Sequence, residues 1–321
     1  MSSIAEGMRQ SWIYGINGVE KTSAGGLKKW IENASYRVIT ANQTNGIVLH
    51  YDPEQDILPF LAFDIDRMQS ASLESAAGAI EHSALGRSLA WLVVRLYYSA
   101  FYAAHSLIRI GGQSCTVFED SQKNELSRIV QAYGFPNNLV TTGLHYIQID
   151  PQSRQVFIKK MRTRPGLGSH ANVWEIHKNW ALEAINKVNA GYSLIEYQAT
   201  FETQMNACLA ITSRDRNGRG IWLSQIRNDV NYQHTHGVWY PYTHKLDLDV
   251  IKRSASNSIR IDPMNVDFTS KNEIEAFVKA AAFIIGISNV TSADLAEKKV
   301  GKHSFFNAGT NPLRRLLRAA H

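Results

Sequence analysis

The feature that most constrains the fold is a long run of apolar residues at helical spacing between residues 72 and 110. They recur at steps of three and four: Leu89, Leu92, Val93, Leu96, Ala100, Ala103, Ala104 and Leu107. This spacing lines one face of an α-helix, and so apolar a face must be buried against other helices. Gly111 and Gly112 end the predicted helix. The pattern therefore indicates a helical bundle.

The rest of the chain divides between helical and strand-like patterns. Helical periodicity predicts further helices at residues 121–133, 171–189, 193–212, about 221–237 and 272–290. Alternating segments around the turns Asn42–Gly46 and Asp150–Ser153 predict β-hairpins within residues 35–63 and 140–161. Residues 238–270 have a mixed pattern that is compatible with one or two strands.

These patterns predict a mainly α protein, in which small β-hairpin insertions accompany a helical bundle. We expect three parts along the chain. They are an N-terminal α/β extension at residues 1–69, the bundle at 70–295 with its β insertion near 140–161, and a basic C-terminal tail at 296–321.

Composition narrows the class of protein. The 321 residues, of which 44% are hydrophobic and 19% charged, suffice for a core and exclude general disorder. Cys115 and Cys208 form no CxxC pair, so we expect neither a structural metal nor a redox dithiol, and a reducing compartment. The first 15 residues lack the apolar core of a signal peptide, and apolar runs such as 276–287 fall short of the ~20 residues of a membrane span. We therefore expect a cytoplasmic protein without membrane contact.

Common cofactor motifs are missing from the sequence. It has no GxxxxGK[ST] loop, no GxGxxG turn after a strand and no GxSxG elbow. This removes the commonest nucleotide-hydrolase, dinucleotide and serine-hydrolase classes, and we expect no cofactor. Lys+Arg 34 against Asp+Glu 28 gives a net charge of +6, which suits a polyanionic partner such as nucleic acid.

One segment, Arg227-Asn-Asp-Val-Asn-Tyr-Gln-His234, concentrates polar functional groups. Arg227 and His234 are seven residues apart, so on one helix they would share a face, about 10 Å apart along the axis. Such a pair suits RNA cleavage without a metal. The imidazole takes the proton of the ribose 2′-hydroxyl, and the guanidinium holds the scissile phosphate. Asn228 would orient the pair, and two copies across a two-fold axis would complete one site.

The same residues also fit a purely structural role. His234 and His236 would then cap a helix and pack a turn, while Arg227 would pair with a carboxylate such as Asp229. His170 and His177, also seven apart, lack the four-residue spacing of a zinc-binding helix, and we expect ordinary surface or core histidines there.

The segment 227–234 resembles the signature of HEPN-domain proteins (higher eukaryotes and prokaryotes nucleotide-binding). That signature is an arginine, commonly followed by a polar residue, and a histidine after four to six further residues; here Asn228 is the polar residue and six residues intervene. The stretch Arg95-Leu-Tyr-Tyr-Ser-Ala-Phe-Tyr-Ala-Ala-His-Ser-Leu-Ile108 is similar to an early helix of many bacterial members, and the order of the two segments is also the family's. The resemblance covers roughly residues 70–290. It implies a helical bundle, dimerisation and, in many members, metal-independent RNase activity in toxin–antitoxin or phage-defence systems.

Several further residues are candidates for RNA contacts. Arg95, Tyr98 and Tyr102 step by three and four along one helix, so tyrosines there could stack on bases while the arginine meets phosphates. The alternative is that the tyrosines are half-buried and the charges lie at the surface. His236 follows the motif histidine, where some family members carry a tyrosine, and Arg219 belongs to a basic loop at 214–219. That loop and residues 162–164 either flank an RNA path or are ordinary solvated loops.

The leading hypothesis is a metal-independent endoribonuclease of HEPN type that acts as a toxin or abortive-infection effector. Arg227 and His234 would be catalytic, Asn228 would support them, and single strands or loops of RNA would be the substrate. A homodimer and an antitoxin or trigger protein are the expected partners. The alternative is a non-catalytic HEPN-like module that binds RNA or a protein, or senses a trigger.

Overall fold

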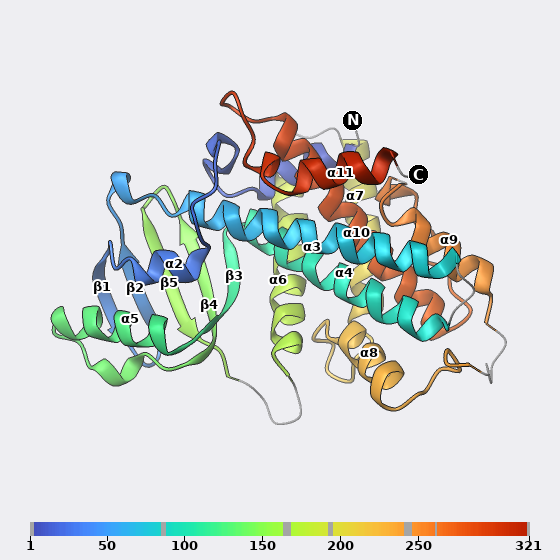
Figure 1. Ribbon diagram of the computed structural model, residues 1–321, viewed down its shortest axis with the longest axis horizontal. Helices are drawn as coiled ribbons and strands as arrows, with labels where there is room; N and C mark the ends of the chain where they lie inside the picture. Colours follow the sequence, from blue (N-terminus) through green and yellow to red (C-terminus); the bar gives the residue numbers. More distant parts are fainter. Residues whose placement is uncertain are drawn as a thin grey trace.

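The computed structural model describes residues 3–84, 88–162, 168–191, 195–240, 246–260 and 262–319. Helices make up 62% of it, and the strands form a single small antiparallel sheet, so the prediction of a mainly α protein is confirmed. Figure 1 shows the sheet at one end of an elongated molecule and the helical bundle at the other. Helix α3 runs from one end to the other.

The bundle is built around α4, which is buried along most of its length. The helices that make up the bundle and its surface are α1 (Ser3–Met8), α3 (Leu58–Ala84), α4 (Leu89–Ile110), α6 (Ser169–Ala190), α7 (Ile195–Thr212), α8 (Trp222–Tyr232), α9 (Leu248–Asn257), α10 (Glu273–Glu297) and α11 (Thr310–Ala319). Helix α4 begins where the Ser88 hydroxyl accepts from the amide of Ala90 and ends at Gly111, as predicted. It packs against α3, α6, α8 and α10, so it brings the later helices together.

The sheet has the strand order β1-β2-β5-β4-β3, and every neighbouring pair is antiparallel. Its strands are β1 (Arg37–Asn42), β2 (Gly46–His50), β3 (Gln113–Phe118), β4 (Gly143–Asp150) and β5 (Gln155–Lys160). Helices α2 (Leu27–Glu32) and α5 (Asp120–Ala132) pack beside it. Both predicted hairpins are present, and the pairing of β2 with β5 joins them into one sheet.

Two hydrophobic clusters form the core. Leu96, Trp174 and Phe277 belong to the cluster between the helices. Ile147 and Phe306 belong to the cluster between the sheet and the first half of α3. Helix α3 therefore takes part in both ends of the molecule.

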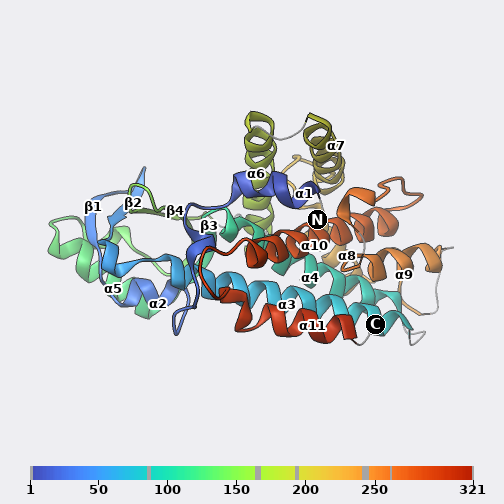
Figure 2. The ribbon, with the colours of Figure 1, turned by 90° about the horizontal axis from the view of Figure 1, so that it is seen from above.

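Several predicted boundaries differ from the structure. Helix α3 begins at Leu58 rather than near residue 72, so the expected boundary between residues 69 and 70 falls inside a continuous helix. The mixed pattern of residues 238–270 was compatible with one or two strands, but the described part of that range holds α9 and a short 3-10 turn, η5 (Pro263–Asn265), and no strand. The expected basic tail contains α11, which packs on α3 (Figure 2). Strand β3 was not predicted.

Helix α10 is long and apolar enough to cross a membrane by length and composition, the one such helix among the described residues. In the fold, 83% of its apolar window is buried inside the molecule. It lies along α4 and forms part of the bundle core.

Candidate functional site

Arg227 lies in the middle of α8 with its side chain turned toward α4 and α6. The residue is 8% exposed. Its Nη1 donates to the Asn228 amide oxygen at 2.7 Å, and its Nη2 lies 3.4 Å from the Tyr98 hydroxyl. Arg227 and Asn228, which are adjacent in the sequence motif, are thus also joined through their side chains.

Three tyrosine rings surround the Arg227 guanidinium. Its central carbon lies 5.1 Å from the ring centre of Tyr97, 5.5 Å from that of Tyr98 and 5.8 Å from that of Tyr232. At these distances the negative faces of the rings attract the cation. The first two rings come from α4 and the third from α8 itself, so the close packing of these two helices forms the cage.

His170 is the histidine that the structure places beside Arg227. Its Nδ1 lies 2.8 Å from the Tyr97 hydroxyl and 3.3 Å from Arg227 Nη2. Its ring stacks on Phe101, with centres 4.2 Å apart. Burial, assisted by the positive charge of Arg227, lowers the pKa of His170 from 6.5 to about 4, so the ring is neutral near pH 7.

The hydrogen bonds fix how neutral His170 carries its proton. The Tyr97 hydroxyl accepts from the Trp174 indole N–H at 3.1 Å and donates to Nδ1 of His170, and Arg227 offers a second N–H to that atom. Because both neighbours are donors, Nδ1 is the acceptor and the proton lies on Nε2. His170 in this state positions Arg227 and has no free nitrogen at that contact to act as a base.

His170 is a partly buried histidine packed on aromatic rings, which agrees with the expectation of a surface or core histidine, but its contact with Arg227 was not predicted. The position of His170 at the start of α6 does not by itself predict a contact with Arg227. Only the packing of α6 against α4 and α8 brings it to the Arg227 cage.

No carboxylate of the described residues forms an ion pair with Arg227, although Asp229 is two positions away. The Nε of Arg227 is buried without a hydrogen-bond partner among the described residues. A buried, uncompensated cation is costly, and a bound anion would relieve that cost. The site therefore has the electrostatics of an anion-binding position.

His234 lies outside the cage. Helix α8 ends at Tyr232, and His234 has a φ of 55°, in the left-handed region. The prediction that Arg227 and His234 share one face of a helix is therefore wrong. The His234 ring is exposed and packs against Trp239 with centres 5.1 Å apart. Among the described residues, no hydrogen bond or ring contact joins it to Arg227.

His236 is engaged within the fold. Its Nδ1 lies 3.3 Å from a carboxylate oxygen of Glu273, and its Nε2 lies 3.9 Å from one of Asp229. It thus connects the end of α8 with the first turn of α10. These contacts favour a structural role for His236 over the predicted RNA contact.

Arg219 belongs to a loop that is organised around a buried carboxylate. Asp215 accepts the backbone N–H groups of Arg219, Gly220 and Ile221 at 2.8–3.2 Å. The Arg219 guanidinium lies 3.7 Å from Glu175. Asp215 therefore already accepts the backbone N–H groups just before α8. These groups are not free to bind an RNA phosphate.

The three residues of α4 that were candidates for RNA contacts, Arg95, Tyr98 and Tyr102, have different surroundings. Tyr98 lies over Arg227, and Tyr102 follows it one turn later with ring centres 6.4 Å apart. Arg95 donates instead to the Gly78 carbonyl of α3 at 2.6 Å. Residues 163 and 164 of the expected basic loop lie outside the described residues.

Exposed aromatic side chains gather beside the cage. Tyr232, which covers one side of Arg227, is 70% exposed. Trp91 is also exposed, and it meets Trp239 edge to face at 5.9 Å. His234 packs on the same Trp239. Tyr232 therefore offers a stacking surface to a ligand at Arg227, and the Trp91–Trp239 pair, which carries His234, is a second exposed aromatic group.

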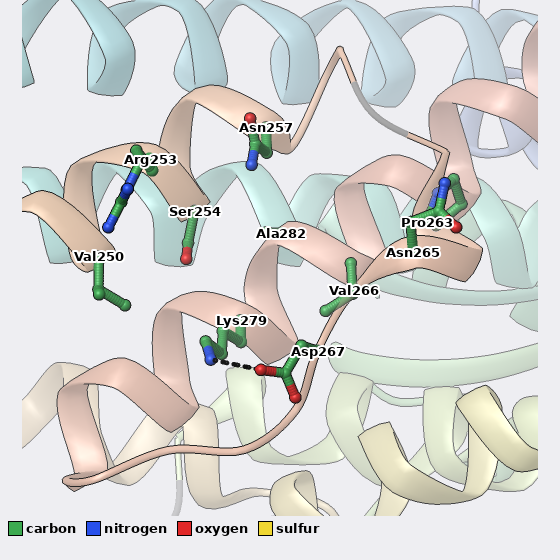
Figure 3. A pocket seen from close by; sticks show the side chains of 10 residues that line it. All are labelled: Val250, Arg253, Ser254, Asn257, Pro263, Asn265, Val266, Asp267, Lys279 and Ala282. Atoms are coloured by element: carbon green, nitrogen blue, oxygen red, sulfur yellow. Dashed lines mark ion pairs between the residues drawn. The ribbon is translucent and has the colours of Figure 1, made fainter.

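A separate pocket of about 260 Å³ opens between α9, α10 and the segment after η5 (Figure 3). Arg253 and Asn257 line it from α9, and Lys279 from α10. The Lys279 ammonium lies 3.8 Å from Asp267 and donates to the Thr269 carbonyl, so its charge is already paired. The described lining of this pocket contains none of the predicted site residues.

The described residues contain no cluster of three or more His, Cys, Asp or Glu side chains that could hold a metal ion. Comparison of the chain with protein-family models, curated proteins and solved structures found no match.

Proposed function

We propose that this protein binds the phosphodiester backbone of RNA at Arg227 and cleaves it as a metal-independent endoribonuclease of HEPN type. The observation that carries the proposal is the nearly buried guanidinium of Arg227, which has no ion pair with a described carboxylate. A phosphate group supplies the missing negative charge, and a planar guanidinium donates to two of its oxygens at once.

The neighbours of Arg227 support this role. Asn228 holds Nη1 through its amide oxygen, which leaves its amide N–H groups free to donate toward a phosphate. Neutral His170 adds no positive charge to the cage and fixes Nη2. The guanidinium is therefore held in one orientation before a ligand arrives, which reduces the entropy lost on binding.

In the proposed reaction, the His234 imidazole accepts the proton of a ribose 2′-hydroxyl. The 2′-oxygen attacks the adjacent phosphorus while Arg227 stabilises the charge that grows on the phosphate oxygens. The bond to the 5′-oxygen breaks, and that oxygen takes up a proton. The products are a 2′,3′-cyclic phosphate and a 5′-hydroxyl, and no external reactant is consumed.

The separation of His234 from Arg227 in one chain favours a composite site in a homodimer. A two-fold axis beside the exposed loop at 233–237 would bring the His234 of one copy toward the Arg227 cage of the other. Single-stranded or loop RNA is the proposed substrate because its bases can stack on Tyr232 and the Trp91–Trp239 pair. An antitoxin or trigger protein would control such an activity in a cytoplasmic toxin or defence system.

The test is cleavage of end-labelled tRNA and total RNA by the purified protein with a chelator present. We expect chelator-resistant cleavage that falls by at least about 100-fold in Arg227→Gln and in His234→Ala. His303→Ala replaces an exposed histidine outside the site and serves as the matched control. Equal cleavage by all four proteins would contradict the assignment.

A second function, binding of RNA without cleavage, is favoured by one specific observation. The only histidine in contact with Arg227 among the described residues is His170, whose Nδ1 already accepts from two donors. Retention of RNA by wild-type protein and its loss in Arg227→Gln, with no cleavage by either, would support this function over the nuclease.

A further inference from the structure

A second cavity lies at the sheet end of the molecule, away from Arg227. It has a volume of about 650 Å³ and opens where the β1–β2 turn, the end of β5 and the 3-10 turn η4 (Asn137–Leu139) meet. Ligand pockets for small molecules commonly have volumes of about 300–1,000 Å³. We propose that this cavity binds a small phosphorylated molecule with an apolar or planar body.

The charge of the cavity is the first argument. Lys159, Lys160 and Arg162 line it, and its described lining residues include no aspartate or glutamate. None of the three cations forms an ion pair with a described carboxylate. Three uncompensated positive charges around one concave surface create a potential that favours a ligand with several negative charges.

Two polar groups, His145 and Lys160, lie at the cavity end of the sheet face that packs into the core. His145 and Lys160 are paired across β4 and β5, two positions along from the pair Ile147 and Ile158, so all four lie on the same face. The two isoleucines are buried in the core cluster of the sheet. Lys160 donates to the Thr142 carbonyl, and burial lowers its pKa. Lys160 is exposed at the end of β5, so its ammonium can meet an anion in the cavity.

His145 is 3% exposed and is held in one orientation. Its Nδ1 lies 2.9 Å from the Gly143 carbonyl, and its ring stacks on Phe118 with centres 4.1 Å apart. Burial lowers its pKa to about 4, so the ring is neutral and Nδ1 carries the proton that this carbonyl accepts. The remaining nitrogen, Nε2, is therefore an acceptor for a hydroxyl or amino group of the ligand.

One wall of the cavity, on the side of α5 and η4, is apolar. Leu126, Leu139 and Val140 line it from α5 and η4. These side chains suit the uncharged body of a ligand, while the cations suit its phosphate groups. A bare inorganic anion would leave this wall uncovered, so a molecule with both parts fits better.

Calorimetric titration of the full chain tests the proposal with three probes. ATP carries both phosphate groups and a planar body, pyrophosphate carries the charge alone, and adenosine carries the body alone. We expect ATP to bind more tightly than pyrophosphate and adenosine to give no measurable binding. Arg162→Gln and the double variant Lys160→Gln/Arg162→Gln should weaken ATP binding, the double variant by about tenfold or more.

Two controls separate this site from others. Lys187→Gln removes an exposed cation on α6 and should bind ATP like the wild type. Arg260→Gln removes an exposed cation outside both proposed sites and should also retain ATP binding. If neither ATP nor pyrophosphate binds, or if the double variant binds both as tightly as the wild type, the proposal is overturned. Arg162 is exposed, so its replacement keeps the test valid even if loss of Lys160 impairs folding.

Discussion

At the scale of single residues, the Arg227 cage combines attraction and cost. Three aromatic rings and three hydrogen-bond acceptors hold the guanidinium, yet its Nε remains without a partner among the described residues. Cation–π contacts contribute roughly 0.5–2 kcal/mol each, which is less than the cost of burying an isolated charge. The contacts of the cage therefore leave the charge of Arg227 without a carboxylate partner among the described residues, which is the basis of the proposed phosphate site.

The first prediction concerns the pH dependence of stability through His170. Its pKa in the folded protein is about 4, against 6.5 as the ordinary value. Between these values the unfolded chain binds a proton that the folded chain does not, so the free energy of unfolding falls as pH drops from 6.5 to 4. His170→Gln keeps an acceptor for Arg227 but cannot titrate, and it should show a shallower decline.

Urea denaturation at several pH values between 4 and 7 measures this effect. His145 and His177, whose pKa values are also lowered to about 4, remain in the variant, so part of the decline persists. The exposed His303→Gln variant should follow the wild type. A His170→Gln profile as steep as that of the wild type would show that His170 does not titrate as described.

The sequence places Arg227 and Asn228 side by side in one motif, and in the structure a hydrogen bond joins their side chains. The sequence could not identify His170 as a neighbour of Arg227, because the two residues are 57 positions apart. Their contact depends on how α6 packs against α4 and α8. Nor could the sequence show that His236 is occupied by Glu273, a residue of another helix. Contacts between distant segments are absent from local spacing.

At the scale of secondary-structure elements, the end of α8 decides where His234 lies. His234 and His236 both have positive φ, and Gly237 follows with φ 63°. A run of left-handed residues cannot continue a helix, so the chain turns away two residues after Tyr232. The sequence placed His234 on the helix because it predicted the helix end about one turn too late, near residue 237 instead of Tyr232.

The second prediction follows from the backbone at His234. Glycine accepts a positive φ without strain, whereas a β-branched residue does not. His234→Gly should match the stability of the wild type or exceed it by up to about 1 kcal/mol. His234→Val should lose about 1–2 kcal/mol.

Both variants remove the imidazole, so the nuclease proposal expects both to lose cleavage. Chemical denaturation and the cleavage assay together measure the two effects. Retained activity in the stable His234→Gly variant would exclude His234 from the reaction.

The strength of the apolar pattern decides which helices and strands could be predicted from the sequence. Helices α4 and α10 have strong apolar periodicity, and the two hairpins have clear turns. Strand β3 is buried at all but one of its positions, so it lacks the alternation that identifies a half-exposed strand. Helix α9 has only two fully buried residues, Ile251 and Ala255, which is too weak a pattern to separate it from a strand.

At the scale of the whole molecule, the C-terminal segment holds the two ends together. Phe305 and Phe306 insert into the core cluster of the sheet, with ring centres 4.3 Å apart. Thr310, at the start of α11, donates its amide to Asp66 of α3 at 2.8 Å. A segment that the sequence marks only as basic is therefore an integral part of the core.

The third prediction is that Phe306→Ala lowers the free energy of unfolding by about 3–5 kcal/mol, because it leaves a cavity in a fully buried position. Val300→Ala, at a site 77% exposed, should change it by less than about 0.5 kcal/mol. Denaturant unfolding of both variants is the measurement. A small effect of Phe306→Ala would mean that the C-terminal segment does not stabilise the sheet.

The role of Arg227 is tested by the affinity of wild-type protein and Arg227→Gln for a fluorescently labelled single-stranded RNA, measured by fluorescence anisotropy at two salt concentrations. If Arg227 holds a phosphate, the variant should bind at least about tenfold more weakly, and its salt dependence should fall by roughly 0.7 in log–log slope. Arg260→Gln removes an exposed arginine outside the cage and should bind like the wild type. A folded Arg227→Gln protein with wild-type affinity and salt dependence would contradict the account.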